Sequence, residues 1–112
     1  MNTILKPMHY NRCLLCGRVA SAPVPSHTNH GRDFCRFLLS VPRLSGQCDV
    51  LHILAPQQLL ENQPLREGDR ITVTGQLRSY NNKTGTTPRL VISVLARTIA
   101  LSDDPACNTI RL

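Results

Sequence analysis

Basic side chains and one tyrosine gather in residues 68–101, a stretch without acids after Asp69. Its cations are Arg70, Arg78, Lys83, Arg89 and Arg97, and Tyr80 lies among them. Cations pair with phosphates and planar groups stack on bases, so this mixture is typical of a surface that holds a nucleic-acid strand. The guanidinium group of arginine can do both, because it is charged and flat.

The charge of the whole chain points the same way. The 112 residues carry a formal net charge of +6, with a pI near 9.6. Residues 11–43 contain five arginines and one acid, Asp33, whereas residues 47–69 contain four acids and one arginine, Arg66. Such separation of the two signs predicts a basic face, and a basic face favours an anionic partner such as nucleic acid.

The other reactive residue types do not form a catalytic or metal-binding set. Cys13 and Cys16 form one CxxC pair, but structural zinc sites need two such pairs or additional histidines. On a strand, residues three apart also point to opposite faces. We therefore predict no metal and no cofactor, with the cysteines as reduced core residues. His27 and His30 lie in a polar stretch, where they are expected to be solvated or to contact phosphate.

Two further classes of protein are disfavoured. The sequence offers no Ser/His/Asp set, no carboxylate pair on a common element and no glycine-rich phosphate loop, which argues against an enzyme. No apolar run is long enough to cross a membrane, and the first ten residues lack the apolar core of a signal peptide. These features predict a cytoplasmic protein without a membrane partner.

Period-2 alternation of apolar residues predicts five strands that would position the basic residues. They span residues 11–20, 33–43, 49–55, 70–78 and 90–101, with a loop over 21–31 and a short helix over 56–62 that starts at Pro56. The expected inward sets are Cys13, Leu15, Gly17 and Val19; Cys35, Phe37, Leu39 and Val41; and Ile71, Val73, Gly75 and Leu77. Leu14, Leu38 and Leu90 fall on the opposite faces, and exposed apolar residues there would favour a homo-oligomer.

This order of elements predicts an all-β protein. Five strands with a short helix between the third and the fourth are the order of the OB-fold, a five-stranded Greek-key barrel. The expected organisation is a leader over residues 1–10, one OB-fold domain over residues 11–101 and a short, poorly ordered tail over residues 102–112.

Four segments resemble the bacterial single-stranded DNA-binding protein family, which includes small PriB-like members. They read NRCLLCGRVASAPV, CRFLLSVPR, GDRITVTGQLRSYNNKTG and RLVISVLARTI, in this order along the chain. The resemblance implies an OB-fold and contact with single-stranded DNA through a basic groove. By position it implies contacts from Arg36, Arg43, Arg78, Tyr80 and Lys83, with Arg12, Arg18 and Arg89 as further candidates. Relatives dimerise through the first strand and then form tetramers, so a homodimer or a homotetramer is expected.

Two departures from the family pattern shape the expected function. Val50 stands where relatives carry an aromatic residue, and few stacking rings remain. Phe34 is either such a ring or part of a subunit interface. Single-strand binding should therefore be weaker and more sensitive to salt. The chain also ends without the family's acidic tip, which favours an accessory, mobile-element or PriB-like variant.

Two functions stay open from the sequence. The first is non-enzymatic, largely sequence-independent binding of single-stranded DNA during replication, recombination or repair, with RNA as a further ligand. The second is an OB-fold module that contacts replication or primosome proteins and binds nucleic acid weakly.

Overall fold

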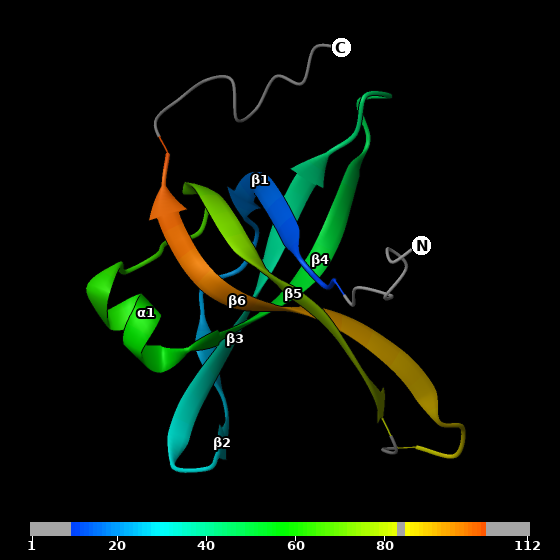
Figure 1. The fold of residues 1–112 in the computed structure, drawn as a ribbon. Helices are drawn as coiled ribbons and strands as arrows, with labels where there is room; N and C mark the ends of the chain where they lie inside the picture. Colours follow the sequence, from blue (N-terminus) through cyan, green and yellow to red (C-terminus); the bar gives the residue numbers. More distant parts are fainter. Residues whose placement is uncertain (1–9, 83–84, 103–112) are drawn as a thin grey trace, which may run out of the picture.

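The computed structural model describes residues 10–82 and 85–102, which fold into strands and one short helix (Figure 1). Their bounds are β1 (Cys13–Val19), β2 (Val24–Asn29), β3 (Arg32–Pro42), β4 (Cys48–Pro56), α1 (Gln57–Asn62), β5 (Arg70–Asn82) and β6 (Arg89–Leu101). Residues 1–9 of the predicted leader, Lys83, and residues 103–112 of the predicted tail lie outside the described residues.

The strands close into the predicted barrel. They follow the order β1-β5-β6-β4-β3-β2, and β1 also pairs with β3 through Arg18–Ser40 and Val19–Leu39. The pairing of β4 with β6 is parallel, and the other pairings are antiparallel. The ring β1-β3-β4-β6-β5, with α1 between its third and fourth strands in chain order, is the OB-fold. The prediction of an all-β OB-fold is confirmed.

Strand β2 corrects the prediction of a loop over residues 21–31. It pairs with β3, and the two strands are joined by His30 and Gly31, whose φ angles are 52° and 76°. Two successive positive φ angles are the geometry of a tight hairpin turn. β2 lies at the edge of the sheet, where Pro25 is tolerated because one side of the strand needs no ladder bonds. Its residues are mostly exposed, so no apolar alternation marks the strand in the sequence.

The barrel core confirms the predicted inward sets of the first two barrel strands. Val19, Phe37 and Leu39 are buried, and so are Ile53 and Ile71 from the following strands. The reason is the period of the strand, which turns every second side chain inward. Removing this apolar surface from water supplies the main driving force for folding, at about 25 cal/mol per Å².

The helix covers one end of the barrel. It begins at Gln57, one residue after the predicted start, because Pro56 still ends β4 and serves as the N-cap. Leu59 and Leu60 pack against the core. No described helix has both the length and the apolar character needed to cross a membrane.

Strands β5 and β6 extend beyond the barrel as a two-stranded arm (Figure 1). Leu77 was expected to face inward with Ile71 and Val73, but it is 51% exposed because its part of β5 has left the barrel. The side chain of Asn11 fixes the base of the arm: its Nδ2 donates to the Leu77 carbonyl, and its Oδ1 accepts from the Leu77 amide, both at 2.7 Å. The side-chain amide of Asn11 thus adds one more pair of hydrogen bonds to the β1–β5 ladder.

The three leucines that were expected to face outward differ in how exposed they are. Leu14 and Leu90 are exposed, as expected, at 68% and 66%. Leu38 is only half-buried, because its strand β3 lies between β2 and β4 and neighbouring side chains cover it.

Candidate nucleic-acid interface

One face of the sheet brings residues from distant parts of the chain into rows. Residues that pair directly across neighbouring strands project to the same side. Leu38 on β3 pairs with His52 on β4, His52 with Ser93 on β6, and Ser93 with Arg78 on β5. The residues of this face, here called the outer face, are Phe34, Arg36, Leu38, Ser40, Val50, His52, Leu54, Pro56, Gln76, Arg78, Tyr80, Arg89, Val91, Ser93 and Leu95.

The outer face gathers several of the predicted site residues. Arg36 on β3 is exposed and pairs with Leu54, which shares a row with Leu95 and Gln76. Arg78, Tyr80 and Arg89 follow along the arm, and Phe34 lies at the other side near the β2–β3 hairpin. No acidic residue belongs to this face of the described strands. Its field therefore attracts anions.

Ring side chains lie among these cations. Phe34 stacks on His27 of β2, with ring centroids 5.1 Å apart and planes inclined by 15°. The His27 ring also bonds Ser26 Oγ at 3.0 Å, which helps to hold its orientation. Tyr80 is 56% exposed on the arm and pairs with Val91. These rings offer flat surfaces on which bases can stack.

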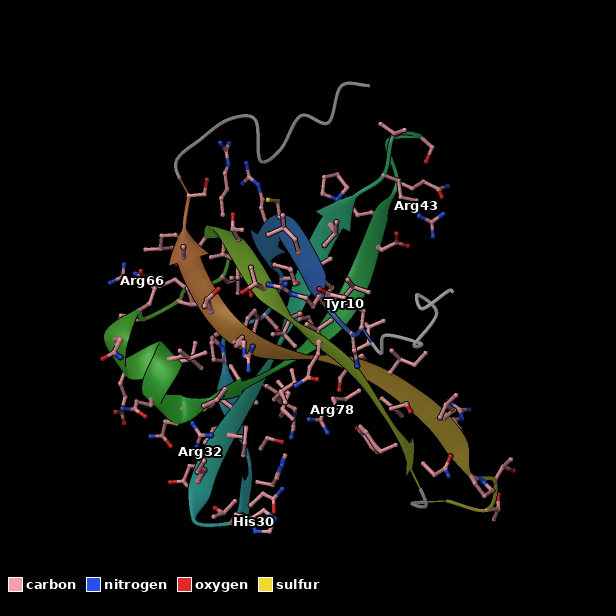
Figure 2. The ribbon with its side chains drawn as sticks, viewed as in Figure 1. Tyr10, His30, Arg32, Arg43, Arg66 and Arg78 are labelled. Carbon is pink, nitrogen blue, oxygen red and sulfur yellow. The ribbon has the colours of Figure 1, made fainter. Side chains whose placement is uncertain are left out.

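Arg43 does not belong to the outer face, and it forms an ion pair with Asp49. It lies at the far end of β3 from Arg32, near the β3–β4 turn (Figure 2). Its Nε donates to both carboxylate oxygens of Asp49 at 2.9 Å. This hydrogen bonding lowers the pKa of Asp49 and raises the pKa of Arg43, so both groups are charged at neutral pH. A phosphate contact by Arg43 stays a prediction, and it would have to compete with this carboxylate.

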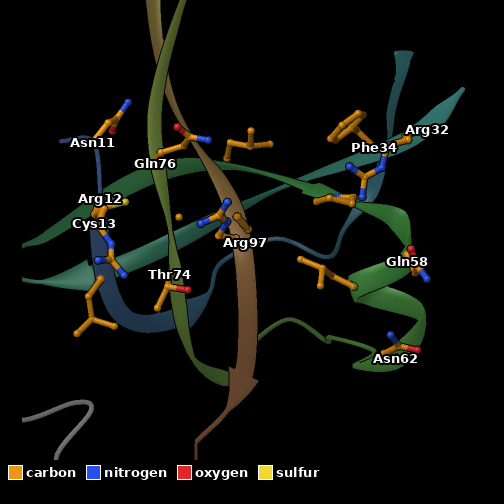
Figure 3. A pocket seen from close by; sticks show the side chains of 16 residues that line it. Asn11, Arg12, Cys13, Arg32, Phe34, Gln58, Asn62, Thr74, Gln76 and Arg97 are labelled. Carbon is orange, nitrogen blue, oxygen red and sulfur yellow. The ribbon is translucent and has the colours of Figure 1, made fainter. Parts of the chain in front are cut away.

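The remaining predicted residues are distributed more widely. Arg12, on the chain just before β1, lines a cleft beside the outer face (Figure 3). Arg18 lies at the other end of β1, where it pairs in register with Arg70 and with Ser40 of the outer face. Lys83 lies outside the described residues. The roles of these residues in DNA contact stay predictions.

Sequence reasoning missed three residues that now lie at or beside the outer face. His52 could have been found from the alternation of DVLHILA, which puts it on the same side as Val50 and Leu54. Arg32 is the first residue of β3, directly after the turn of the β2–β3 hairpin, so its place could not be predicted without that hairpin. Arg97 lies where a bulge interrupts the alternation of β6, so the period of that strand does not show which way its side chain points.

The cysteines and histidines assemble no metal centre in the part of the chain that the structure describes. Cys13 and Cys16 lie on one strand, and Cys16 Sγ contacts Thr72 Oγ1 at 3.5 Å. Burial, with a smaller effect of Asp33, raises the pKa of the Cys35 thiol. A raised pKa keeps this thiol protonated and unreactive.

Comparisons with known proteins agree with this geometry. The model of the single-strand binding protein family matches residues 10–102. The dimeric structure of the N-terminal domain of the PriB protein from Thermoanaerobacter tencongensis is 38% identical, with a TM-score of 0.72, over 84% of this chain and 98% of that one. No match was found among curated protein sequences.

Two more distant structures share the fold. A small single-stranded DNA-binding protein from Streptomyces coelicolor is 24% identical, with a TM-score of 0.67, over 86% of this chain and 97% of that one. A Plasmodium falciparum SSB in complex with ssDNA is 20% identical, with a TM-score of 0.70, over 88% of this chain and 100% of that one.

Proposed function

Because the chain belongs to the single-strand binding protein family, we propose that its domain over residues 11–101 binds single-stranded DNA on the outer face, with little sequence preference. The observation that carries this proposal is the joint placement of cations and rings on one acid-free face. Arg36, Arg78 and Arg89 supply the charges, and Phe34 and Tyr80 supply the rings.

The position of this face within the fold supports the proposal. OB-folds bind oligonucleotides on the face of their second and third strands and on the loops that flank it. Here those strands are β3 and β4, and the flanking segments are the β2–β3 hairpin and the arm. The geometry suits a strand that lies across the sheet between the hairpin and the arm.

The physical mechanism needs no chemical step. Arginines on the outer face pair with phosphates and release the counterions that surround the strand. Phe34 and Tyr80 stack on bases, and stacking tolerates any base because every base has a flat face. Few rings are present, so phosphate contacts contribute a large part of the affinity. A non-enzymatic role follows from this mechanism.

The proposal also covers the oligomeric state and the cellular role of the protein. The PriB domain that is 38% identical is dimeric, and the exposed Leu14 and Leu90 offer apolar surface for a similar association. We infer a homodimer, with a homotetramer as the larger alternative. The protein would coat or position unwound strands during replication, recombination or repair, in the cytoplasm with the nucleoid.

A second function is favoured by one specific observation. The arm carries Leu77, Leu90 and Ile92 on the side opposite Arg78 and Tyr80, and these three side chains are 51%, 66% and 58% exposed. Apolar surface of this kind marks contacts with other proteins. Together with the likeness to PriB, it supports a module that contacts primosome or replication proteins and binds nucleic acid weakly.

The test is the affinity for fluorescent oligo-dT, oligo-U and duplex DNA across a series of salt concentrations, followed by anisotropy. We expect the single strand to bind more tightly than the duplex. Three phosphate contacts, from Arg36, Arg78 and Arg89, predict a log–log salt slope of about −2, since each contributes roughly −0.7 on single strands.

Arg78→Gln is expected to make this slope shallower by about 0.7, because one phosphate contact is lost. Arg66→Gln changes an exposed arginine outside the outer face and serves as the control. Tighter binding of oligo-U would make RNA the ligand. Absence of binding to either single strand at low salt would contradict the proposal and leave the protein-contact module as the function.

A further inference from the structure

His52 lies in the middle of the outer face, between Arg36 on β3 and Arg78 on β5. It is exposed on β4 and pairs with Leu38 of β3 on one side and with Ser93 of β6 on the other. Ser93 pairs in turn with Arg78, so His52 and Arg78 share one row and are separated by a single short side chain. The imidazole of His52 is therefore placed along the path of a strand that crosses the outer face from β3 to β5.

A hollow of about 220 Å³ brings His52 together with Arg36 on this face. The other residues that line it are uncharged: Ser21, Val24, Phe37 and Leu38. A phosphate group in this hollow can approach the guanidinium of Arg36 and the ring of His52 together. Whether the phosphate then meets one cation or two depends on the charge of His52.

The charged groups that share the outer face with His52 are cations. Arg36 approaches it from β3 and Arg78 lies beyond β6, whereas β6 itself presents uncharged residues beside it. The nearest acid along β4, Asp49, lies three residues away, so it points to the opposite side of the strand, and it is bonded to Arg43. The other imidazole of this region, His27 on β2, stacks on Phe34 at the edge of the face.

A proton on His52 therefore meets no carboxylate on this face of the described strands. The imidazole forms no hydrogen bond or ion pair with another side chain of the described residues. Histidine is the side chain whose charge ordinarily changes between about pH 5 and about pH 8. In its charged form both ring nitrogens donate, and hydrogen bonds from a charged donor to phosphate are shorter and stronger than neutral ones. A phosphate of a bound strand is thus the anion with which protonated His52 can pair.

We propose that protonation of His52 regulates the affinity of the outer face for single-stranded DNA. The inference rests on the proposed function. At low pH the imidazolium adds a cation between Arg36 and Arg78, and binding tightens. As the pH rises, His52 becomes neutral, the added phosphate contact is lost and binding weakens. Linkage requires the converse as well, so a bound phosphate promotes the uptake of a proton by His52.

The experiment measures the affinity for oligo-dT by anisotropy at about pH 5.5 and at about pH 7.5, which bracket the titration of an imidazole. Neither the phosphodiester groups nor the thymines change charge in this range. We expect the unchanged protein to bind about fivefold more tightly at the lower pH, which is the upper end for one exposed ion pair. The log–log salt slope should also be steeper at the lower pH, by roughly 0.7 for one further phosphate contact.

Two substitutions of His52 should remove this pH dependence in different ways. His52→Gln has no titratable proton, so the ratio of its affinities at the two pH values should fall to about one. His52→Arg carries a permanent charge, so at both pH values it should bind about as tightly as the unchanged protein does at the lower pH. A purely structural role of His52 would not make the arginine variant bind more tightly at the higher pH.

His30→Asn is the control, because His30 lies at the tip of the β2–β3 hairpin and asparagine tolerates its positive φ (Figure 2). This variant should keep the pH dependence of the unchanged protein, and thermal melting at both pH values checks that each variant folds. The inference is overturned if the unchanged protein shows no pH dependence, if folded His52→Gln keeps it, or if His27→Gln loses it instead. Failure of the unchanged protein to bind oligo-dT at either pH would overturn the proposed function itself.

Discussion

Replacing Tyr80 by leucine is expected to lower the affinity for oligo-dT by roughly 5- to 150-fold, which corresponds to the 1–3 kcal/mol that one stacked base contributes. The ring is 56% exposed on the arm and lies on the same face as Arg78. It has no place in the core, so its loss should not unfold the domain. Fluorescence anisotropy at one fixed salt concentration measures the change.

Tyr80→Phe is the matched control, because it removes the hydroxyl and keeps the ring. Its affinity should stay within about twofold of the unchanged protein, since stacking uses the face of the ring. If the leucine variant binds as tightly as the phenylalanine variant, Tyr80 is no stacking platform. Binding would then rest on the arginines and on Phe34.

Gly75→Ala is expected to lower the free energy of unfolding by about 3 kcal/mol, the upper end of the range for overpacking. The added Cβ would meet the carbonyl group of Leu95, which belongs to the backbone and cannot rotate away. Strands β5 and β6 would have to separate where Thr74 and Thr98 are hydrogen-bonded through their side chains. Urea unfolding followed by circular dichroism measures the loss.

Gly46→Ala separates the collision from ordinary backbone strain. Gly46 has a φ of 94°, but no atom lies within 4 Å of a Cβ placed there. The strain of a left-handed residue costs about 1–2 kcal/mol. Equal losses in the two variants would show that β5 and β6 do not approach closely at Gly75. This outcome would contradict the bulge of β6 at Arg97.

The barrel could be predicted because its core strands obey a simple period. Phe37 and Leu39 alternate with outward residues on β3, and Ile71 and Val73 do so on β5. Burial on one side of a strand forces this pattern into the sequence. Strand β2 gave no such signal, because it lies at the sheet edge and its residues are mostly exposed.

The site was only partly predictable, because it depends on register between strands far apart in the chain. The sequence and its resemblance named Arg36 and Arg78, but their common face follows from the pairing of β3, β4, β6 and β5. The bond between Arg43 and Asp49 depends likewise on the β3–β4 turn. The direction of the Arg97 side chain depends on a bulge in β6. The bulge shifts the alternation by one residue, so the direction cannot be predicted from the period of the strand.

The most direct test of single-strand binding on the outer face is a titration of ¹⁵N-labelled protein with unlabelled oligo-dT, followed by amide chemical shifts. The predicted result is that the largest shifts fall on β3 near Phe34 and Arg36, on β4 near His52 and on the arm near Tyr80, with little change in the β3–β4 turn over residues 44–47. Shifts concentrated in that turn, or no shifts on the outer face while the oligonucleotide binds, would contradict the account.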